Sequence, residues 1–478
     1  MKKKDTLILG IILAVALGLR LYHVNAPLAD FHSWRQADTA AVGRNFEQNG
    51  FNLMMPQYDD LSNLQSGIDN PHGYRFVEFP IYNAMFAAFH KALPILSLET
   101  WARLVAVFFS LVCISVLYYL ALIEAGRVTA IFTSITYAVM PFFVYFSRTI
   151  LPETPALGFA LLSVFLLHLF TTEKGAKKWI WFFSSSLLFA IALLIKPTAV
   201  FYTVPLLFLF VRKYRFTLPR QLHVVLYFII AALPLVLWRY YIIKFPEGIP
   251  ASNWLISQVN TYEGQKDIFM RPAFFRWIFY ERINNIILGG YLTVFFVLGF
   301  LKKQKTWLPF ALIFASFLYI FVFQGGNVQH AYYQIIAFPG IALAVGLGVA
   351  AILENKSAFF NPYIATPIIV VVFSASFLFS WYQVKDYYNV PQDLLLMAKI
   401  IQTFSRPTDL VVADRMGDTT LLYLANRKGS PLLYRTPEEF KKMGYSYVLT
   451  DKSEIIAKLK LAKYKVLFEN NQFALFAL

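Results

Sequence analysis

Residues 30–80 hold the densest group of side chains that could do chemistry. Two carboxylates, Asp30 and Asp38, lie there with the cation Arg35, and His32 stands between them. A carboxylate can take the proton of an attacking hydroxyl group, and Lys or Arg can stabilise a departing phosphate as its negative charge builds up. The residue types therefore suit a transfer from a phosphate-bearing lipid to a hydroxyl acceptor.

A helix is predicted over residues 33–49, and its polar side chains gather on one face. That face carries Arg35, Asp38, Thr39 and Asn45. Ser33 and Gln36 predict a capping box at its start. The alternative interpretation is a solvated helix along the membrane surface, with an i, i+3 ion pair between Arg35 and Asp38.

Further polar side chains lie where long apolar runs end. They are Glu78, Arg148, Glu153, Lys196, His330, Tyr332 and Tyr333. An ionisable group within a bilayer costs about 2.5–3.5 kcal/mol, so such groups are functional candidates. The alternatives are that Lys196 reaches the lipid headgroups, that Arg148 and Glu153 form a structural ion pair, and that His330 caps an interfacial helix.

These side chains must be positioned by membrane helices, because the composition excludes a soluble globule. The chain has 478 residues, of which 58% are hydrophobic and only 15% charged, where about 25% is usual for soluble domains. The net charge of +16 lies in short clusters between apolar runs, as in cytoplasmic loops, which argues against a nucleic-acid partner. The single cysteine, Cys113, excludes an internal disulfide and a cysteine metal cluster.

About eleven transmembrane helices are predicted from apolar runs of about 17–22 residues, each long enough to cross about 30 Å of hydrocarbon. Their approximate ranges are 6–24, 101–122, 128–147, 154–171, 179–195, 198–211, 222–239, 283–301, 307–323, 331–353 and 363–381. The basic clusters then all fall on the cytoplasmic side. A signal peptide cleaved near Ala16 is the alternative for the first run, but hydrophobicity continues to Leu21.

The predicted transmembrane domain covers residues 1–385 and includes a large first outer loop, 25–100, with a second short helix starting near Pro80. A second outer loop at 240–280 is expected to help shape an acceptor site. Residues 386–478 predict a small extracytoplasmic α/β domain. Its strands are expected at 409–414, 445–451 and 464–469, and a helix should start at Thr436-Pro437-Glu438-Glu439 and end near Gly444.

The segment SWRQADTAAVGRNFEQNG followed by VEFPIY resembles the polyprenyl-phosphate-dependent glycosyltransferases of the GT-C fold. These are bacterial relatives of the protein O-mannosyltransferases and of the lipid A aminoarabinose transferase. RTILPETPALGF resembles the outer turn of that family, which usually has Asp where this chain has Glu153. LLIKPTAVFYTVPLL resembles its lysine-bearing turn, at Lys196, and HAYYQIIAFPG its histidine–tyrosine segment before a late helix. The resemblance covers about residues 1–350.

The family implies an inverting sugar transfer from a polyprenyl phosphate to a lipid, glycan or protein acceptor, outside a bacterial inner membrane. An acidic residue of the first outer loop would be the base: the helix motif favours Asp38, and the place after the first helix favours Asp30. Of the two, Asp38 is the preferred prediction and Asp30 is the alternative. Glu78 would contact acceptor, sugar or a metal. The residues expected to bind substrate and phosphate are Arg35, His32, Arg148, Glu153, Lys196, His330, Tyr332 and Tyr333. The relatives differ over metal use, so no cofactor is predicted as essential and a divalent metal stays an open alternative.

Two other classes of function remain. A transporter of lipid-linked sugars would need a cavity open to both sides, usually between internal repeats. The polar groups here gather at one face and no repeat is visible, which argues against it. A non-catalytic membrane scaffold would use the C-terminal domain to bind envelope partners.

Overall fold

The computed structural model describes residues 2–252, 272–304, 306–355 and 361–478. The chain divides into two compact units. The helical unit consists of Met1–Val24, Arg103–Trp238 and Ser252–Asp386, and the mixed unit consists of Asn25–Ala102, Arg239–Ala251 and Tyr387–Leu478. Residues 253–271 of the predicted outer loop at 240–280 lie outside the described residues.

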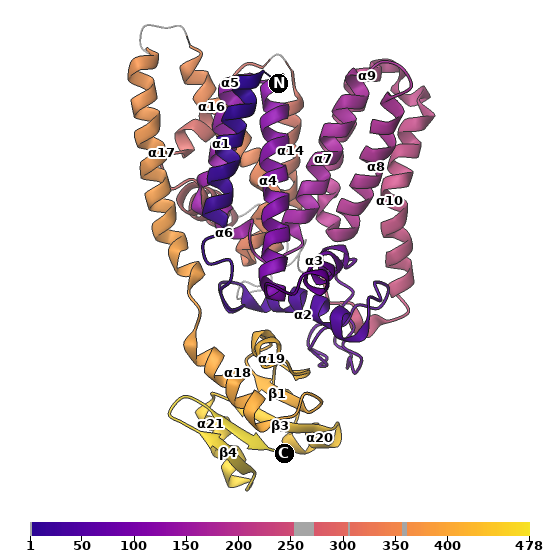
Figure 1. Cartoon of the computed structure of the whole chain (residues 1–478), viewed down its shortest axis with the longest axis vertical. Coiled ribbons are helices and arrows are strands. Elements are labelled where there is room, and N and C mark those ends of the chain that lie inside the picture. The colour runs from indigo at the N-terminus through magenta and orange to yellow at the C-terminus, as the bar shows by residue number, and fades with distance from the viewer. Residues whose placement is uncertain (1, 253–271, 305, 356–360) are drawn as a thin grey trace. The chain divides into compact units, whose positions relative to one another are not determined.

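Most of the described helices belong to the helical unit (Figure 1). They are α1 (Lys3–Arg20), α4 (Leu98–Glu124), α5 (Arg127–Val139), α6 (Pro141–Phe146), α7 (Glu153–Thr172), α8 (Lys178–Ile195), η1 (Pro197–Tyr202), α9 (Thr203–Tyr214), η2 (Arg215–Arg220), α10 (Leu222–Ile242), α12 (Pro272–Phe275), η5 (Arg276–Ile287), α13 (Thr293–Leu301), α14 (Leu308–Val322), α15 (Gln324–Gln329), η6 (Ala331–Ala337), α16 (Phe338–Leu353), α17 (Pro362–Val384) and η8 (Lys385–Tyr388).

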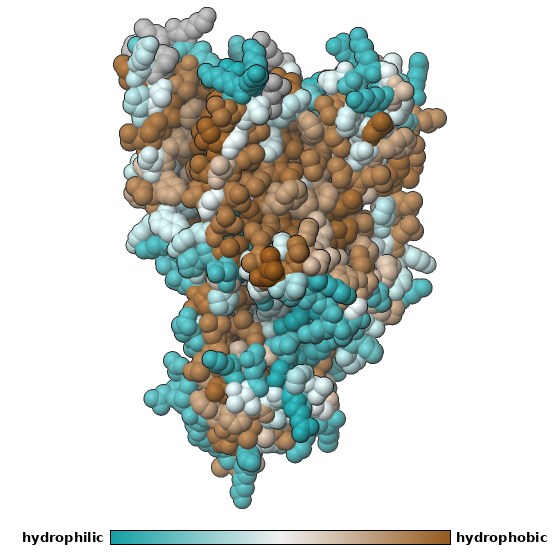
Figure 2. All heavy atoms as spheres, in the orientation of Figure 1, coloured by the Kyte–Doolittle hydropathy of each residue, from teal (hydrophilic) through white to brown (hydrophobic). Residues whose placement is uncertain are grey.

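Six helical segments among the described residues are long and apolar enough to cross a membrane. They are Leu98–Glu124, Glu153–Thr172, Lys178–Ile195, Leu222–Ile242, Ala331–Leu353 and Tyr363–Phe404. Figure 2 shows hydrophobic side chains along the flanks of these helices and hydrophilic ones at their ends. The membrane-type helical fold is therefore confirmed, while the count of eleven spans stays a prediction.

Two of the predicted helices are broken. The helix expected at 128–147 stops at Met140, whose backbone is extended (ψ 127°), because Pro141 disfavours a helical residue before it. The helix expected at 283–301 is interrupted between η5 and α13, where Gly289 and Gly290 adopt left-handed conformations (φ 57° and 78°). A Cβ on Gly289 would lie 2.0 Å from the carbonyl oxygen of Ser376, so only glycine fits this turn.

The basic clusters of the helical unit meet at one end of its helices, where the N-terminus, the start of α5 and the end of α9 lie (Figure 1). Three ion pairs join helix ends there: Arg127 to Asp5 (2.6 Å), Arg212 to Glu124 (2.7 Å) and Lys302 to Glu354 (2.8 Å). Each of these helix ends was assigned to the cytoplasmic side from the sequence. Their grouping supports the predicted alternation of the helices.

The mixed unit combines the first outer loop with the C-terminal segment. Its helices are α2 (Ser33–Asn49), α3 (Ile81–Ala92), η3 (Pro246–Gly248), α18 (Gln392–Phe404), α19 (Thr420–Ala425), α20 (Pro437–Lys442) and α21 (Ser453–Leu461). Its strands are β1 (Leu410–Asp414), β2 (Gly429–Ser430), β3 (Tyr445–Thr450), β4 (Lys465–Glu469) and β5 (Ala474–Ala477), in the order β2-β1-β3-β5-β4. β1 is parallel to β2 and β3, and β5 is antiparallel to β3 and β4.

The local predictions for the C-terminal segment are confirmed. The three predicted strands are β1, β3 and β4. Thr436 and Glu439 form the capping box at the start of α20, and Gly444 follows that helix with φ 91°. The two faces of the sheet carry separate cores, since Val411 packs in one cluster and Val412 in the other.

Residues of the first outer loop complete this sheet. Gly429 in β2 donates its N–H to the carbonyl oxygen of Asp59 (2.9 Å), and the N–H of Leu61 donates to the carbonyl oxygen of Gly429 (2.7 Å). Ala29 is buried in the same core cluster as Met397, Val411 and other residues of the C-terminal segment. The loop and the C-terminal segment thus share one core.

Candidate active site

Helix α2 spans Ser33–Asn49 as predicted, but its start is built differently. The cap residue is His32, in a left-handed conformation (φ 58°, ψ 33°), so the predicted capping box of Ser33 and Gln36 is wrong. Eleven of the 17 residues of α2 are buried, and the solvated-helix interpretation is therefore wrong too. The Gln36 amide instead donates to Asp30 Oδ1 (2.7 Å) and to the carbonyl oxygen of Phe31 (3.1 Å).

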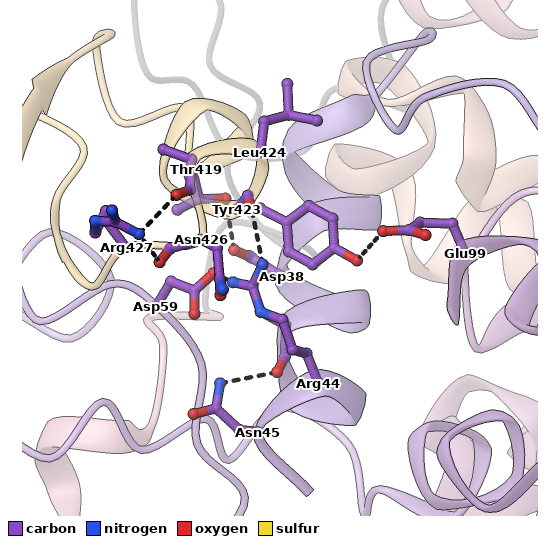
Figure 3. Close-up of polar contacts among 12 residues, drawn as sticks. Asp38, Arg44, Asn45, Asp59, Glu99, Thr419, Tyr423, Leu424, Asn426 and Arg427 are labelled. Atoms are coloured by element: carbon purple, nitrogen blue, oxygen red, sulfur yellow. Dashed lines mark hydrogen bonds and ion pairs between the residues drawn. The ribbon is translucent and has the colours of Figure 1, made fainter. Parts of the chain in front are cut away.

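Asp38 lies within a network of buried polar groups. Its Oδ2 forms an ion pair with Arg75 Nη2 at 2.7 Å, and its Oδ1 accepts a hydrogen bond from the Thr419 hydroxyl (2.7 Å, Figure 3). Burial raises the pKa of Asp38, and the charges of Arg75 and Arg35 offset part of that rise. The side chain has no exposed surface.

Arg75 connects Asp38 to a second buried carboxylate. Its guanidinium lies 4.8 Å from the centre of the Tyr58 ring, and the Tyr58 hydroxyl is 3.3 Å from Asp60 Oδ2. Burial raises the pKa of Asp60 to about 6, although the Ser62 N–H donates to its Oδ1. The sequence analysis missed Arg75 and Asp60, because isolated charges in an irregular segment carry no periodic signal.

Arg35 and Glu78 form an ion pair (2.5 Å), and the Arg35 guanidinium also donates to the Thr39 hydroxyl (3.1 Å). The predicted alternative of an ion pair between Arg35 and Asp38 is wrong, because Arg35 pairs with Glu78 and Asp38 pairs with Arg75. Asn83 of α3 donates to the carbonyl oxygen of Thr39 (2.7 Å), which ties α3 to the same turn of α2. Two predicted site residues, Arg35 and Glu78, are thus brought together.

The helical unit contains a second buried pair. Glu153, the first residue of α7, lies 2.7 Å from Lys196, the residue that follows α8. Both side chains are buried, so the alternative that Lys196 reaches the headgroups is wrong. Neither carboxylate oxygen of Glu153 accepts a hydrogen bond from any residue that the structure describes. Arg148 instead donates to the carbonyl oxygen of His23 (3.1 Å), so the predicted Arg148–Glu153 pair is not formed.

Three aromatic side chains flank this pair within the helical unit. The Tyr333 ring lies 5.5 Å from Lys196 Nζ, and the rings of His330 and Tyr332 are stacked with their centres 5.5 Å apart. Tyr332 and Tyr333 are buried. His330 precedes η6 but its side chain does not cap that helix. The structure therefore groups five residues that the sequence had predicted separately: Glu153, Lys196, His330, Tyr332 and Tyr333.

The carboxylate, imidazole and thiol groups are scattered in the part of the chain that the structure describes. No three His, Cys, Asp or Glu side chains there lie close enough together to hold an ion. The chemistry available to these residues is proton transfer by carboxylates and charge stabilisation by Lys and Arg.

Residues 80–238 match the family model of the dolichyl-phosphate-mannose-protein mannosyltransferases. No curated protein sequence matches the chain.

Several solved structures share its fold, including the following two. ArnT from Cupriavidus metallidurans, crystallised with undecaprenyl phosphate, has a TM-score of 0.65 at 14% identity, over 98% of this chain and 97% of that one. The archaeal oligosaccharyltransferase AglB from Archaeoglobus fulgidus, in complex with an inhibitory peptide and a dolichol-phosphate, has a TM-score of 0.59 at 11% identity, over 94% of this chain and 69% of that one.

At these identities the two structures establish the fold. The family model adds a match in sequence over the segment that contains Glu153 and Lys196. The resemblance predicted from the motifs, to the polyprenyl-phosphate-dependent glycosyltransferases of the GT-C fold, is therefore confirmed.

Proposed function

We propose that the chain is a glycosyltransferase that moves a sugar from a polyprenyl phosphate to a hydroxyl acceptor on the extracytoplasmic side of a bacterial inner membrane. The observation that carries the proposal is the buried Lys196–Glu153 pair, in a fold shared with a protein crystallised with undecaprenyl phosphate. The pair lies at the start of α7, whose 20 residues extend about 30 Å to the end where the basic clusters gather. That distance is the thickness of the hydrocarbon core.

Lys196 holds the phosphate of the sugar donor in this proposal. Its ammonium group is a compact charge, which suits a phosphate. Glu153 keeps it oriented and compensates its charge before the donor binds. The Glu153 oxygens, which accept no hydrogen bond from the described residues, suit the hydroxyl groups of the transferred sugar.

Asp30 is the proposed base, in preference to Asp38. Asp38 is fully buried, and its two oxygens contact Arg75 and Thr419, so a substrate would have to displace a cation to reach it. Asp30 follows the first helix, where the resemblance places the base, and the Gln36 amide donates to its Oδ1 at 2.7 Å and helps to orient the carboxylate. Arg35 and Arg148 remain as further cations for the phosphate, and Glu78 holds Arg35.

The reaction follows from these roles. Asp30 takes the proton of the acceptor hydroxyl as its oxygen bonds to the anomeric carbon. The bond from that carbon to the phosphate oxygen breaks on the opposite face, so the configuration is inverted. The polyprenyl phosphate leaves with the bonding electron pair, and Lys196 stabilises its added charge.

Native mass spectrometry of the gently purified protein tests the sugar-donor site. We expect a bound polyprenyl phosphate, with or without a sugar, that is lost in the Lys196→Ala variant. Lys174→Ala is the matched control, because Lys174 is exposed and lies between α7 and α8 at the other end of those helices. Only bulk phospholipid, or equal retention in both variants, would contradict the proposal.

A transfer assay with polyprenyl-phosphate sugars tests the base. Asp30→Asn should lower the rate by about 10²–10⁴-fold, the usual contribution of a general base. It should leave retention of the sugar donor unchanged. Retention without any transfer by the wild-type protein would instead favour a transporter of lipid-linked sugars.

A further inference from the structure

The backbone on both sides of Asp30 is held by the C-terminal segment, Tyr387–Leu478. Ala29 is 4% exposed and packs in the core that this segment forms on one face of its sheet. Phe31 donates its N–H to the carbonyl oxygen of Tyr387 (3.0 Å), and their rings stack with centres 4.1 Å apart. Asp30 itself therefore has little freedom to move while these two neighbours stay in place.

The first turns of α2 are held by the same segment. The Thr419 hydroxyl donates to Asp38 Oδ1 (2.7 Å) and has the carbonyl oxygen of Trp34 as a second acceptor (3.2 Å). The next residue, Thr420, donates to the Ser33 hydroxyl (3.0 Å). Because Gln36 lies on these turns and orients Asp30, the contacts fix the carboxylate as well as the helix.

A second set of contacts anchors α19 from its other end (Figure 3). Arg44 of α2 donates to the carbonyl oxygen of Tyr423 (2.7 Å), packs over its ring (4.3 Å) and pairs with Asp59. The Tyr423 hydroxyl donates to Glu99 (2.6 Å). The contacts of Tyr423 therefore hold α19 independently of Thr419, so α19 can act as a rigid support for α2.

We propose that the C-terminal segment positions the base, and that Thr419 is the positioning residue at the centre of this contact. Asp38 serves as the acceptor of the Thr419 hydroxyl and so transmits the position of α19 to α2. The inference rests on the proposed function, since it assigns a role relative to Asp30. A displacement of about 1 Å in a catalytic group can cost about 10²-fold in rate, so loss of one buried contact is measurable.

The test compares Thr419→Val with Thr419→Ser in the full-length protein. Valine keeps the shape and removes the hydroxyl, whereas serine keeps the hydroxyl. We expect Thr419→Val to lower kcat by about 10–10²-fold with an unchanged KM for the sugar donor, and Thr419→Ser to recover most of the rate. The matched control is Thr403→Val, because Thr403 is exposed on α18 and bonds only within its own helix.

The pH profile of kcat shows whether Asp38 only transmits the position of α19 to α2 or is itself the base. The Thr419 hydrogen bond lowers the pKa of Asp38, so its removal raises that pKa. If Asp30 is the base, Thr419→Val lowers kcat without moving the acidic limb of the profile. A limb that moves to higher pH would overturn the assignment and make Asp38 the base.

Hydrogen exchange gives a readout that does not depend on activity. Peptides covering residues 29–40 should exchange faster in Thr419→Val than in Thr403→Val, while peptides of β1 stay protected. If the wild-type protein transfers no sugar but this difference is found, the proposed function fails and the positioning contact stands. If exchange at 29–40 is unchanged, or if β1 loses protection as well, the positioning role is wrong.

Discussion

The helical unit and the mixed unit each bury a carboxylate beside a cation, and the surroundings of the two carboxylates differ. Glu153 in the helical unit has Lys196 at 2.7 Å and accepts no hydrogen bond from a described residue. Asp38 in the mixed unit has Arg75 at the same distance and accepts a hydrogen bond from Thr419. One pair lies among helices, and the other belongs to a network of residues from α2, the first outer loop and the start of α19.

This difference indicates what each site is built to do. A buried carboxylate with one cationic partner and no further hydrogen-bond donor is unfavourable in the unbound protein, so such a group calls for an explanation. A ligand rich in hydroxyl groups would supply the missing donors to Glu153. The Asp38 network, in which the carboxylate has both an ion pair and a hydrogen bond, instead fixes geometry, which is what a positioning element needs.

The largest expected effect comes from breaking the pair of Lys196 and Glu153. Lys196→Met should lower the free energy of unfolding by about 3–5 kcal/mol, because it leaves the Glu153 charge buried without its partner. The double variant with Glu153→Gln should recover most of the stability but not the binding of the sugar donor. Denaturant unfolding in detergent, with native mass spectrometry, measures both. If the double variant regained the lipid, the pair would be structural only.

The next effect is a pH dependence confined to the mixed unit. The folded pKa of Asp60 is about 6 and its ordinary value is 3.8, so the folded state binds more protons between these values. The free energy of unfolding should therefore fall as the pH rises from about 4 to about 6, by about 3 kcal/mol in total, and stay level above that. Unfolding midpoints of wild type and Asp60→Asn at pH 4 to 7 measure this.

In that series Asp60→Asn should flatten the dependence, since its amide does not titrate. Asp393→Asn, a change in the partly exposed first turn of α18, is the control and should keep the wild-type slope. An equal slope in wild type and Asp60→Asn would show that Asp60 is not the titrating group.

The smallest effects come from adding one methyl group at a helix contact in each unit. A Cβ on Gly43 of α2 would lie 2.1 Å from the buried Phe86 ring, and one on Gly158 of α7 would lie 2.7 Å from Phe109. Each Gly→Ala change should cost about 1–3 kcal/mol through overpacking. We expect Gly43→Ala to cost more stability and also to lower transfer, because it displaces α2, and Gly158→Ala to reduce stability alone. Parallel unfolding and transfer assays decide this.

Local patterns predicted much of the architecture. The bounds of α2, the three strands and the capping box at Thr436 follow from periodicity and short-range chemistry, and the structure has them. The break in the helix at 283–301 had a signal in the sequence, the adjacent glycines 289 and 290. Glu153 and Lys196 were both predicted as site residues, because Glu153 precedes a long apolar run and Lys196 follows one.

The pairing of these residues could not be predicted. Glu153 contacts Lys196 because α7 and α8 pack as a hairpin. Without that packing, the sequence could not show whether Lys196 or Arg148 is the ion-pair partner of Glu153. Thr419 was missed because a lone threonine gives no signal and its partner Asp38 is 381 residues away. Arg75 was missed for the same reason, since its partner Asp38 lies on α2 and Tyr58 lies in the loop that follows that helix.

The burial of Ala29 in the core of the C-terminal segment also bears on how the protein is made. A chain grows from its N-terminus at about 5–20 residues per second, so roughly 20–75 s pass between the addition of Asp38 and the addition of Thr419 to the growing chain. During that time residues 25–102 are without the strands that complete their core. The contacts that hold Phe31 and Asp38 can therefore form only after the C-terminal segment has been made, and we expect a chain cut short before β1 to lack them.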